Sequence, residues 1–409
     1  MLIKTKRMLV LLLIILKETG PTAACSSSCS SRCDCSERGL SSVPQDLPTS
    51  ITHLHLERNV ITTLGPSDFF SYNSLTHLDL QDSQVSVINS GAFAYLDRLT
   101  HLKLDWNKLT SLRADMLTGL VNLQYFELRE NLLTSLTADL FVRLEKLLYL
   151  GLDHNSIHSI EAGTFSANPQ LQHIDLQHNN ISNIAAERFV NMTRLKFLDL
   201  SVNKISTISA RAFANLPRLE VLDLSYNSIN MFPADLLSNL NLDSRLHTLR
   251  VDMNDLETLP VEAYDILVST GDVHILDNPW QCDCRMLPFR QRMAGSHSFE
   301  SEISCSGPPN LPENSLLHDL NPGDLICENT TTTREVSDPT ADQTTPQTTV
   351  QPIPQPSPQT TAQPADQPTL EPIVQTTALN NCPNNFLNNC LNKCLNNCQN
   401  NYLNNCPNN

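Results

Sequence analysis

The residues whose chemistry is clearest from their spacing are the cysteines, 13 in number, which fall into three clusters. The clusters are Cys25, Cys29, Cys33 and Cys35; Cys282, Cys284, Cys305 and Cys327; and Cys382, Cys390, Cys394, Cys398 and Cys406. Two even clusters at the ends of a cysteine-free stretch favour disulfides formed within each cluster. Zinc is the competing interpretation of a Cys-x-Cys pair, but these clusters contain too few well-spaced histidines.

A second group of residues suits binding. In residues 99–109, LTHLKLDWNKL, polar and aromatic residues alternate with leucines, and similar copies of the stretch follow. Aromatic side chains bring large contact areas at low entropic cost and dominate binding hot spots, especially inside a polar rim. The candidate ligand-binding residues are Trp106, Tyr125, Tyr149, His101, Lys103, Asp105, Glu127, Arg129 and His154. The alternative is that these rings only cover neighbouring backbone and keep the surface soluble.

A repeat must position both groups. The pattern Leu-x-Leu-x-x-Asn recurs with a step of 24 residues, apart from one step of 27 beside NLNLDS. The register residues are Asn59, Ser83, Asn107, Asn131, Asn155, Asn179, Asn203, Asn227, Asn254 and Asn278. Self-similarity at this period predicts a solenoid whose two ends need caps.

One unit shows how the repeat folds. Leu198 and Leu200 alternate as on a short strand with one buried face. The residues between such leucines face the other way, onto one open parallel sheet. The asparagine amide can donate and accept, so it can pair backbone groups that no strand satisfies. A core column of stacked rings is expected at Phe69, Phe93, Phe141, Phe165, Phe189 and Phe213, with Leu117, Leu237 and Tyr264 in the gaps.

Charge and the first residues indicate the compartment. The formal net charge of −16 argues against nucleic acid and anionic lipid as partners, because both need a basic surface. Residues 1–24 have a basic start, a short apolar run and small residues before Cys25, as in a secretory signal peptide. No later segment approaches 18 uncharged apolar residues, so we expect a secreted, extracellular chain without membrane insertion.

The repeat resembles that of extracellular leucine-rich-repeat proteins. The segment CSSSCSSRCDCSERGLSSVPQDLP is similar to their N-terminal cysteine cap, and NPWQCDCRMLPFRQRM with its later cysteines is similar to their C-terminal cap. The resemblance implies an α/β solenoid, a curved horseshoe with a parallel concave β-sheet, capped by disulfides at both ends. It also implies the pairs Cys282–Cys305 and Cys284–Cys327. In the first cluster, Cys25, Cys29, Cys33 and Cys35 pair among themselves in one of three connectivities.

The layout of caps, repeats, stalk and cysteine-rich end further resembles the variable lymphocyte receptors of jawless vertebrates. Other secreted or surface recognition proteins share such an architecture. The resemblance implies protein or glycan ligands on the concave face.

Composition divides the chain into six segments. The segment 328–379 is rich in Thr, Pro and Gln and has too few apolar residues to form a core, so it is predicted to be a disordered stalk. The tail has an odd number of cysteines, which favours disulfides between chains. The alternative for the tail is a simple-sequence expansion without a role. The expected segments are signal peptide 1–24, N-terminal cap 25–50, repeats 51–272, C-terminal cap 273–327, stalk 328–379 and Asn/Cys tail 380–409.

Several further positions have expected roles. Trp280, at the junction with the second cap, is predicted to be buried. Sequons place N-glycosylation at Asn180, Asn191 and Asn329. No metal or cofactor is expected, although histidines on adjacent strands could support a pH-dependent or metal-assisted contact. The chain lacks G-x-S-x-G, a phosphate loop and H-E-x-x-H, so no enzyme is predicted.

These observations predict a secreted recognition protein that binds a protein or glycan ligand on its concave face. An immune-like, disulfide-linked homo-oligomer is one form of this prediction. The alternative is an extracellular matrix or signalling adaptor that binds one endogenous host protein.

Overall fold

The computed structural model describes residues 25, 29–234, 246–312 and 314–327. The chain has two compact units, residues 1–332 and 333–409, and all described residues belong to the first unit. The predicted signal peptide, stalk and tail, Asn329, the tail cysteines and Leu237 lie outside the described residues.

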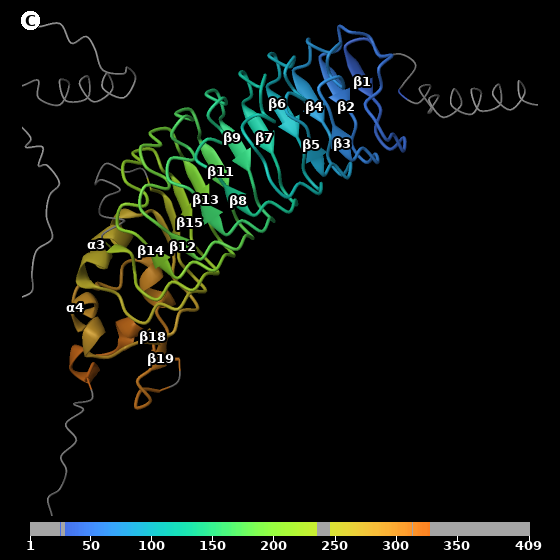
Figure 1. Ribbon diagram of the computed structural model, residues 1–409. Coiled ribbons are helices and arrows are strands. Elements are labelled where there is room, and N and C mark those ends of the chain that lie inside the picture. Colours follow the sequence, from blue (N-terminus) through green and yellow to red (C-terminus); the bar gives the residue numbers. More distant parts are fainter. Residues whose placement is uncertain (1–24, 26–28, 235–245, 313, 328–409) are drawn as a thin grey trace, which may run out of the picture. The chain divides into compact units, whose positions relative to one another are not determined.

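The described residues form the predicted solenoid. Eleven parallel strands make one sheet in the order β1-β2-β4-β6-β7-β9-β11-β13-β15-β16-β17, and Figure 1 shows them following one another along a curved body. The strands are β1 (Arg32–Asp34), β2 (His53–His55), β4 (His77–Asp79), β6 (His101–Lys103), β7 (Tyr125–Glu127), β9 (Tyr149–Gly151), β11 (His173–Asp175), β13 (Phe197–Asp199), β15 (Val221–Asp223), β16 (Thr248–Arg250) and β17 (Asp272–His274).

The return segments of the repeats consist of turns and very short strands. Neighbouring returns pair as β3 (Thr63–Leu64) with β5 (Val87–Ile88), β8 (Ser135–Leu136) with β10 (Ser159–Ile160), and β12 (Asn183–Ile184) with β14 (Thr207–Ile208). From the last repeat onward the chain also forms helices: α3 (Val261–Ser269), α4 (Leu287–Arg290) and 3₁₀ turns at Cys284–Met286, Ser298–Glu302, Leu317–Asp319 and Pro322–Asp324.

Leucine pairs and a column of phenylalanine rings fill the core. Leu198 and Leu200 are fully buried, as are their equivalents in the other repeats. Phe69 stacks on Phe93 with ring centroids 5.9 Å apart, and a second run of rings continues from Phe141 to Phe213. The predicted ring column is therefore confirmed, with buried Leu117 in its gap.

The asparagine ladder is also confirmed. The Asn131 side-chain amide donates to the carbonyls of Leu104 and Leu128 at 2.9 and 3.1 Å, and its Oδ1 accepts from the Leu109 N–H at 3.0 Å. Ser83 takes the ladder position of one repeat and donates to the Leu56 carbonyl at 2.8 Å. Each side chain thus satisfies backbone groups of its own repeat and of the preceding one.

Disulfides close both ends of the stack. Cys25 is bonded to Cys35 and Cys29 to Cys33, which settles the connectivity that the spacing leaves open. At the other end the pairs are Cys282–Cys305 and Cys284–Cys327, as the resemblance implies. This cap contains the short pair β18 (Trp280–Gln281) and β19 (Cys305–Gly307). Trp280 is fully buried there, as predicted.

Candidate ligand-binding site

A continuous ladder of rings covers the face of the sheet that points away from the core. His53, His77, His101, Tyr125, Tyr149, His173 and Phe197 occupy equivalent positions on seven successive strands, and each ring stacks on the next. We call this set the ring ladder. Five of its ring-to-ring distances lie between 4.1 and 4.6 Å, and the Tyr125–Tyr149 distance is 6.3 Å. The rings of the core phenylalanines are 5.6–6.0 Å apart, which is more than most of the ring-ladder distances. Successive repeats are therefore closer together at the sheet than at the core, and the sheet face is concave.

Hydrogen bonds fix the histidine rings at the N-terminal end of the ladder. The Thr76 hydroxyl donates to the Thr52 carbonyl at 3.0 Å and lies 2.9 Å from Nδ1 of His77. Because the hydroxyl has a single proton, His77 Nδ1 must be the donor in that second bond. Burial, followed by the charges of His101 and His53, lowers the pKa of His77 to about 4. His77 is therefore neutral at pH 7, and burial also lowers the pKa values of His53, His101 and His173.

Trp106 lies beyond the end of β6, in the turn that leads to Asn107. Its φ angle is +55°, and the residue before the asparagine has a positive φ in every repeat from Arg58 to Met253. The left-handed conformation carries the side chain to the edge of the sheet, where Trp106 is 48% exposed. The Arg129 guanidinium lies 5.9 Å from the Trp106 ring centroid, within the range of a cation–π contact.

Arg129 also connects two strands through Asp153. Its Nε lies 3.0 Å from Asp153 Oδ2, and the same oxygen is 3.0 Å from His154 Nδ1. The Asp153 side chain is only 6% exposed, whereas that of Arg129 is 48% exposed. The His154 ring stacks on His178 at 4.1 Å. Ion pairing and stacking thus hold the side chains around Trp106 in place.

A polar hollow of about 240 Å³ opens on this face between β6 and β11. Its walls include five of the predicted binding residues: Asp105, Trp106, Glu127, Arg129 and Tyr149. We call this feature the acidic hollow. Its other lining residues are Gln81, Gly151, Asp153, Asp175 and Gln177.

Asp105 differs from a surface contact residue. It is 5% exposed, and its Oδ1 accepts a hydrogen bond of 2.8 Å from the Arg129 backbone N–H. Burial and then the charge of Glu127 raise its pKa to about 7. Asp105 therefore lies in the floor of the acidic hollow, because its carboxylate turns inward to the neighbouring repeat.

The other predicted residues lie beside the acidic hollow. Tyr125 is 37% exposed in the ring ladder, His101 stacks on it at 4.4 Å, and Lys103 lies 3.6 Å from Glu127. His154 is at the far end of the Asp153 ion pair. Sequence reasoning did not select Gly151 or Asp175. The signal was present, because Gly151 interrupts a column of charged residues between Glu127 and Asp175.

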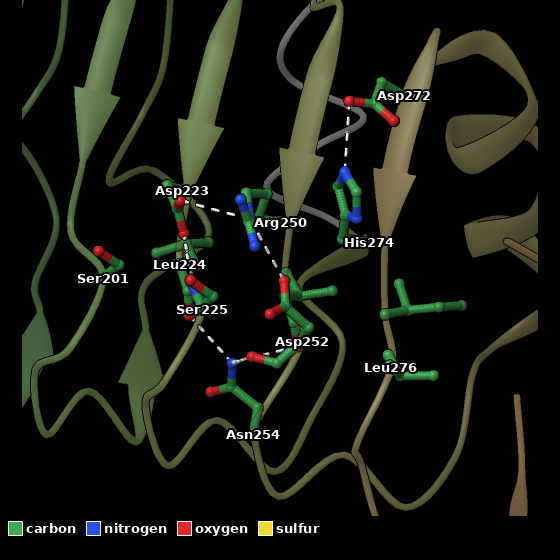
Figure 2. A network of polar contacts seen from close by, with 12 residues as sticks. Ser201, Asp223, Leu224, Ser225, Arg250, Asp252, Asn254, Asp272, His274 and Leu276 are labelled. Atoms are coloured by element: carbon green, nitrogen blue, oxygen red, sulfur yellow. Dashed lines mark hydrogen bonds and ion pairs between the residues drawn. The ribbon is translucent and has the colours of Figure 1, made fainter. Parts of the chain in front are cut away.

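Charges on the C-terminal strands of the sheet are balanced differently. Figure 2 shows Arg250 between Asp223 and Asp252, and its Nε is 3.5 Å from a carboxylate oxygen of each. His274 lies 3.3 Å from Asp272. One arginine thus bridges two carboxylates in this region.

In two places among the described residues, side chains of types that can bind a metal ion lie close together. His55 on β2, Glu57 just beyond it and Asp79 on β4 have ligand atoms within 4.8 Å of one another. Asp283, Cys284 and Cys327 form the second group, but its two sulfur atoms are bonded to each other. All three side chains of the first group are partly exposed, and such groups are common on acidic surfaces without a metal.

The sequons that the structure describes lie on the surface. Asn180 and Asn191 are both exposed. Asn191 lies in a return segment, where its Oδ1 accepts a hydrogen bond of 2.8 Å from Asn215. A glycan on Asn191 would therefore leave the sheet face open.

A disulfide-capped parallel solenoid with an open polar and aromatic sheet defines a class of repeat protein that works as a binding scaffold. The family model described as Leucine rich repeat matches residues 49–109, 104–157, 146–205 and 198–256, together just over half of the chain. The chain therefore belongs to the leucine-rich repeat family. Proteins of this family are typically non-enzymatic and commonly mediate protein–protein recognition.

Individual proteins resemble the chain over shorter stretches. The platelet glycoprotein Ib beta chain of Rattus norvegicus is 36% identical over 84 residues, which are 18% of this chain and 40% of that protein. The human glycoprotein Ib beta chain is 37% identical over 60 residues, 14% of this chain and 29% of that one. The chain thus matches well under two thirds of the length of these curated relatives.

Solved structures show the same fold. A leucine-rich-repeat chain from an octameric complex of Latrophilin 3, Unc5D and FLRT2 has a TM-score of 0.60 and 24% identity, covering 74% of this chain and 98% of that one. A chain of the mouse RP105/MD-1 complex has a TM-score of 0.52 and 23% identity, covering 69% and 52%. None of the helices in the described residues is long and apolar enough to cross a membrane.

Proposed function

We propose that this chain is a secreted recognition protein that binds a protein or glycan ligand on its concave face. The aromatic centre of three successive repeats, exposed Trp106 and Tyr125 with half-buried Tyr149, carries the proposal. Trp106 is 48% exposed and Tyr125 37%, so both rings are open to a ligand. Charged residues surround them, and an aromatic centre with a polar rim is typical of specific protein interfaces.

Rigidity supports the same proposal. Stacking of the ring ladder and the Arg129–Asp153 ion pair hold the contact residues before a ligand arrives. A preorganised face loses little conformational entropy on binding, so more of the contact energy appears as affinity. Disulfides in both caps fit an extracellular location, where such bonds persist.

Multivalent, immune-like recognition is the form of the proposal that the tail favours. Cys382, Cys390, Cys394, Cys398 and Cys406 would link chains by disulfides, with residues 328–379 as a spacer. Linked copies raise avidity without any new contact. N-glycans at Asn180, Asn191 and Asn329 would add to the surface of such a protein.

The second candidate function is an extracellular matrix or signalling adaptor that binds one host protein. It would use the same concave face. A binding screen separates the two candidates: the secreted full chain is presented multivalently to microbial surfaces, glycan arrays and host extracellular proteins. Microbial hits support immune-like recognition, a single host protein supports the adaptor, and the absence of any ligand contradicts both.

A further inference from the structure

One position in the column of residues that borders the acidic hollow has no side chain. Lys103, Glu127, Gly151 and Asp175 stand side by side in the sheet register, and only Gly151 has no side chain. The Tyr149 ring bends over the glycine: its Cε1 and hydroxyl oxygen lie 3.3 and 3.4 Å from where a Gly151 Cβ would be. The result is a cavity of about 240 Å³ closed on one side by a phenol.

Carboxylates outnumber cations in this cavity. Asp105, Glu127, Asp153 and Asp175 line it, and Arg129 is the one cationic lining residue. Arg129 already pairs with Asp153 at 3.0 Å, and Lys103 reaches Glu127 from outside the lining at 3.6 Å. Asp175 has no such ion pair among the described contacts and accepts only a neighbouring backbone N–H and the Gln177 amide.

Burial first, and neighbouring negative charge second, raise the pKa values of two carboxyl groups in the hollow. Burial is the main cause that raises the pKa of Asp175 to about 6. A backbone hydrogen bond from Gln177 opposes the rise, and the charge of Asp153 adds to it. Burial and the charge of Glu127 raise the pKa of Asp105 to about 7. By contrast, Arg250 bridges Asp223 and Asp252 on the C-terminal strands, as Figure 2 shows. The hollow lacks an equivalent bridging cation among the described residues.

We propose that the acidic hollow is a subsite for one basic side chain, arginine or lysine, of a protein ligand. The inference rests on the proposed concave-face function and narrows its ligand to a protein with an exposed basic residue. A guanidinium entering the hollow beside the Tyr149 ring would meet Asp175 and Glu127, with the Tyr149 hydroxyl as a further acceptor. Arginine fits best, because its planar fork donates to two carboxylates and stacks on rings such as Trp106.

The two tryptophans of the chain make a direct test. The full-length secreted protein is labelled with 5-fluorotryptophan, and the two fluorine resonances are followed by NMR. Trp106 lies at the rim of the hollow and reports on binding, whereas Trp280 is fully buried in the C-terminal cap and serves as the reference. The probe is Nα-acetyl-arginine-N-methylamide, and the control is the citrulline analogue, a near-isostere without charge. We expect arginine to shift the Trp106 fluorine resonance with a Kd of about 1 mM, citrulline to bind at least tenfold more weakly, and Trp280 to stay unchanged.

Matched variants locate the subsite. Asp175→Asn removes a charge from the hollow, and Asp79→Asn removes one from the same column outside it; both carboxylates accept a backbone hydrogen bond of 3.1 Å from a glutamine. We expect Asp175→Asn to weaken arginine binding about tenfold and Asp79→Asn to change it less than twofold. Gly151→Leu, which fills the cavity, should abolish binding. Arginine should also bind more tightly at pH 8 than at pH 5.5.

Three results would overturn the inference: an unmoved Trp106 resonance, equal binding of the citrulline probe, or an equal effect of Asp175→Asn and Asp79→Asn. Its failure is separate from that of the proposed function. A ligand found in the screen and lost without the aromatic centre would uphold the function even if arginine does not bind. Arginine binding with no protein ligand in the screen would instead contradict the function.

Discussion

The Tyr149 ring lies over Gly151, its neighbour two residues along β9, with Cε1 3.3 Å from the position of a glycine Cβ. The same ring stacks on His173 at 4.6 Å in the ring ladder. A single residue therefore joins the rigid ladder to the wall of the acidic hollow. The predictions below test what each part contributes to stability and binding.

The asparagine ladder should be a large source of stability. Asn131→Ala removes a side chain that is 5% exposed and that satisfies backbone groups of two repeats. We expect the free energy of unfolding to fall by about 2–4 kcal/mol, because these groups become buried and unpaired. Urea unfolding followed by circular dichroism measures this.

Asn131→Ser is the matched control, since Ser83 fills the equivalent position naturally and still donates at 2.8 Å. It should cost clearly less than Asn131→Ala. Equal losses for the two variants would mean that the ladder hydrogen bonds are not what stabilises the turn.

The ring ladder should weaken in acid. The pKa of His77 is about 4 in the folded chain and about 6.5 when unfolded, so the unfolded state binds more protons between these values. Stability should therefore fall as pH drops from about 7 to about 4. His77→Phe keeps a ring, as Phe197 does on β13, and should reduce this fall. Urea midpoints at pH 7, 5.5 and 4.5 provide the measurement, and parallel curves for parent and variant would contradict the account.

Asp105 should have the opposite pH effect. Its folded pKa of about 7 lies above the ordinary aspartate value of 3.8, so the folded state binds more protons between these values and loses stability as pH rises. Asp105→Asn can still accept from the Arg129 N–H but does not titrate. Relative to the parent, the variant should gain about 2 kcal/mol between pH 4.5 and pH 8, allowing for the titration shared with Glu127. A pH-independent difference would refute this assignment.

Val202 should be a strained position. Its φ is +51°, a left-handed conformation that a β-branched residue adopts at a cost and that asparagine tolerates. We expect Val202→Asn to raise the free energy of unfolding by about 1 kcal/mol. Thermal and urea unfolding would both show this gain, and a loss would mean that packing of the valine side chain outweighs backbone strain.

The repeat made much of the fold predictable. A period of 24 residues specifies which leucines, phenylalanines and asparagines face inward, so the strands, the Phe69–Phe93 stacking and the Asn131 bonds followed from the sequence. Periodicity assigns a residue to a face but not to a rotamer or a backbone basin. The burial of Asp105 and the positive φ of Trp106 depend on how each turn meets the next repeat.

The acidic hollow was harder to predict for a related reason. It forms from residues of five successive repeats, and the Tyr149 ring, which lies over Gly151, forms part of its wall. The column that contains Gly151 was visible in the sequence, yet a glycine there can equally leave flat backbone. Only the cross-strand arrangement distinguishes a cavity from a flat surface.

The central claim is that the aromatic centre of the concave face binds the ligand. The most direct measurement compares the full chain with a variant carrying Trp106→Ala, Tyr125→Ala and Tyr149→Ala, using any ligand found in the screen. The matched control carries His53→Ala, Phe197→Ala and Tyr226→Ala, which removes the same number of rings from equivalent positions outside the centre. We predict at least a hundredfold loss of affinity in the first variant and less than a fivefold loss in the control. Equal affinity of both variants would contradict the account and direct the search to the caps or the convex side.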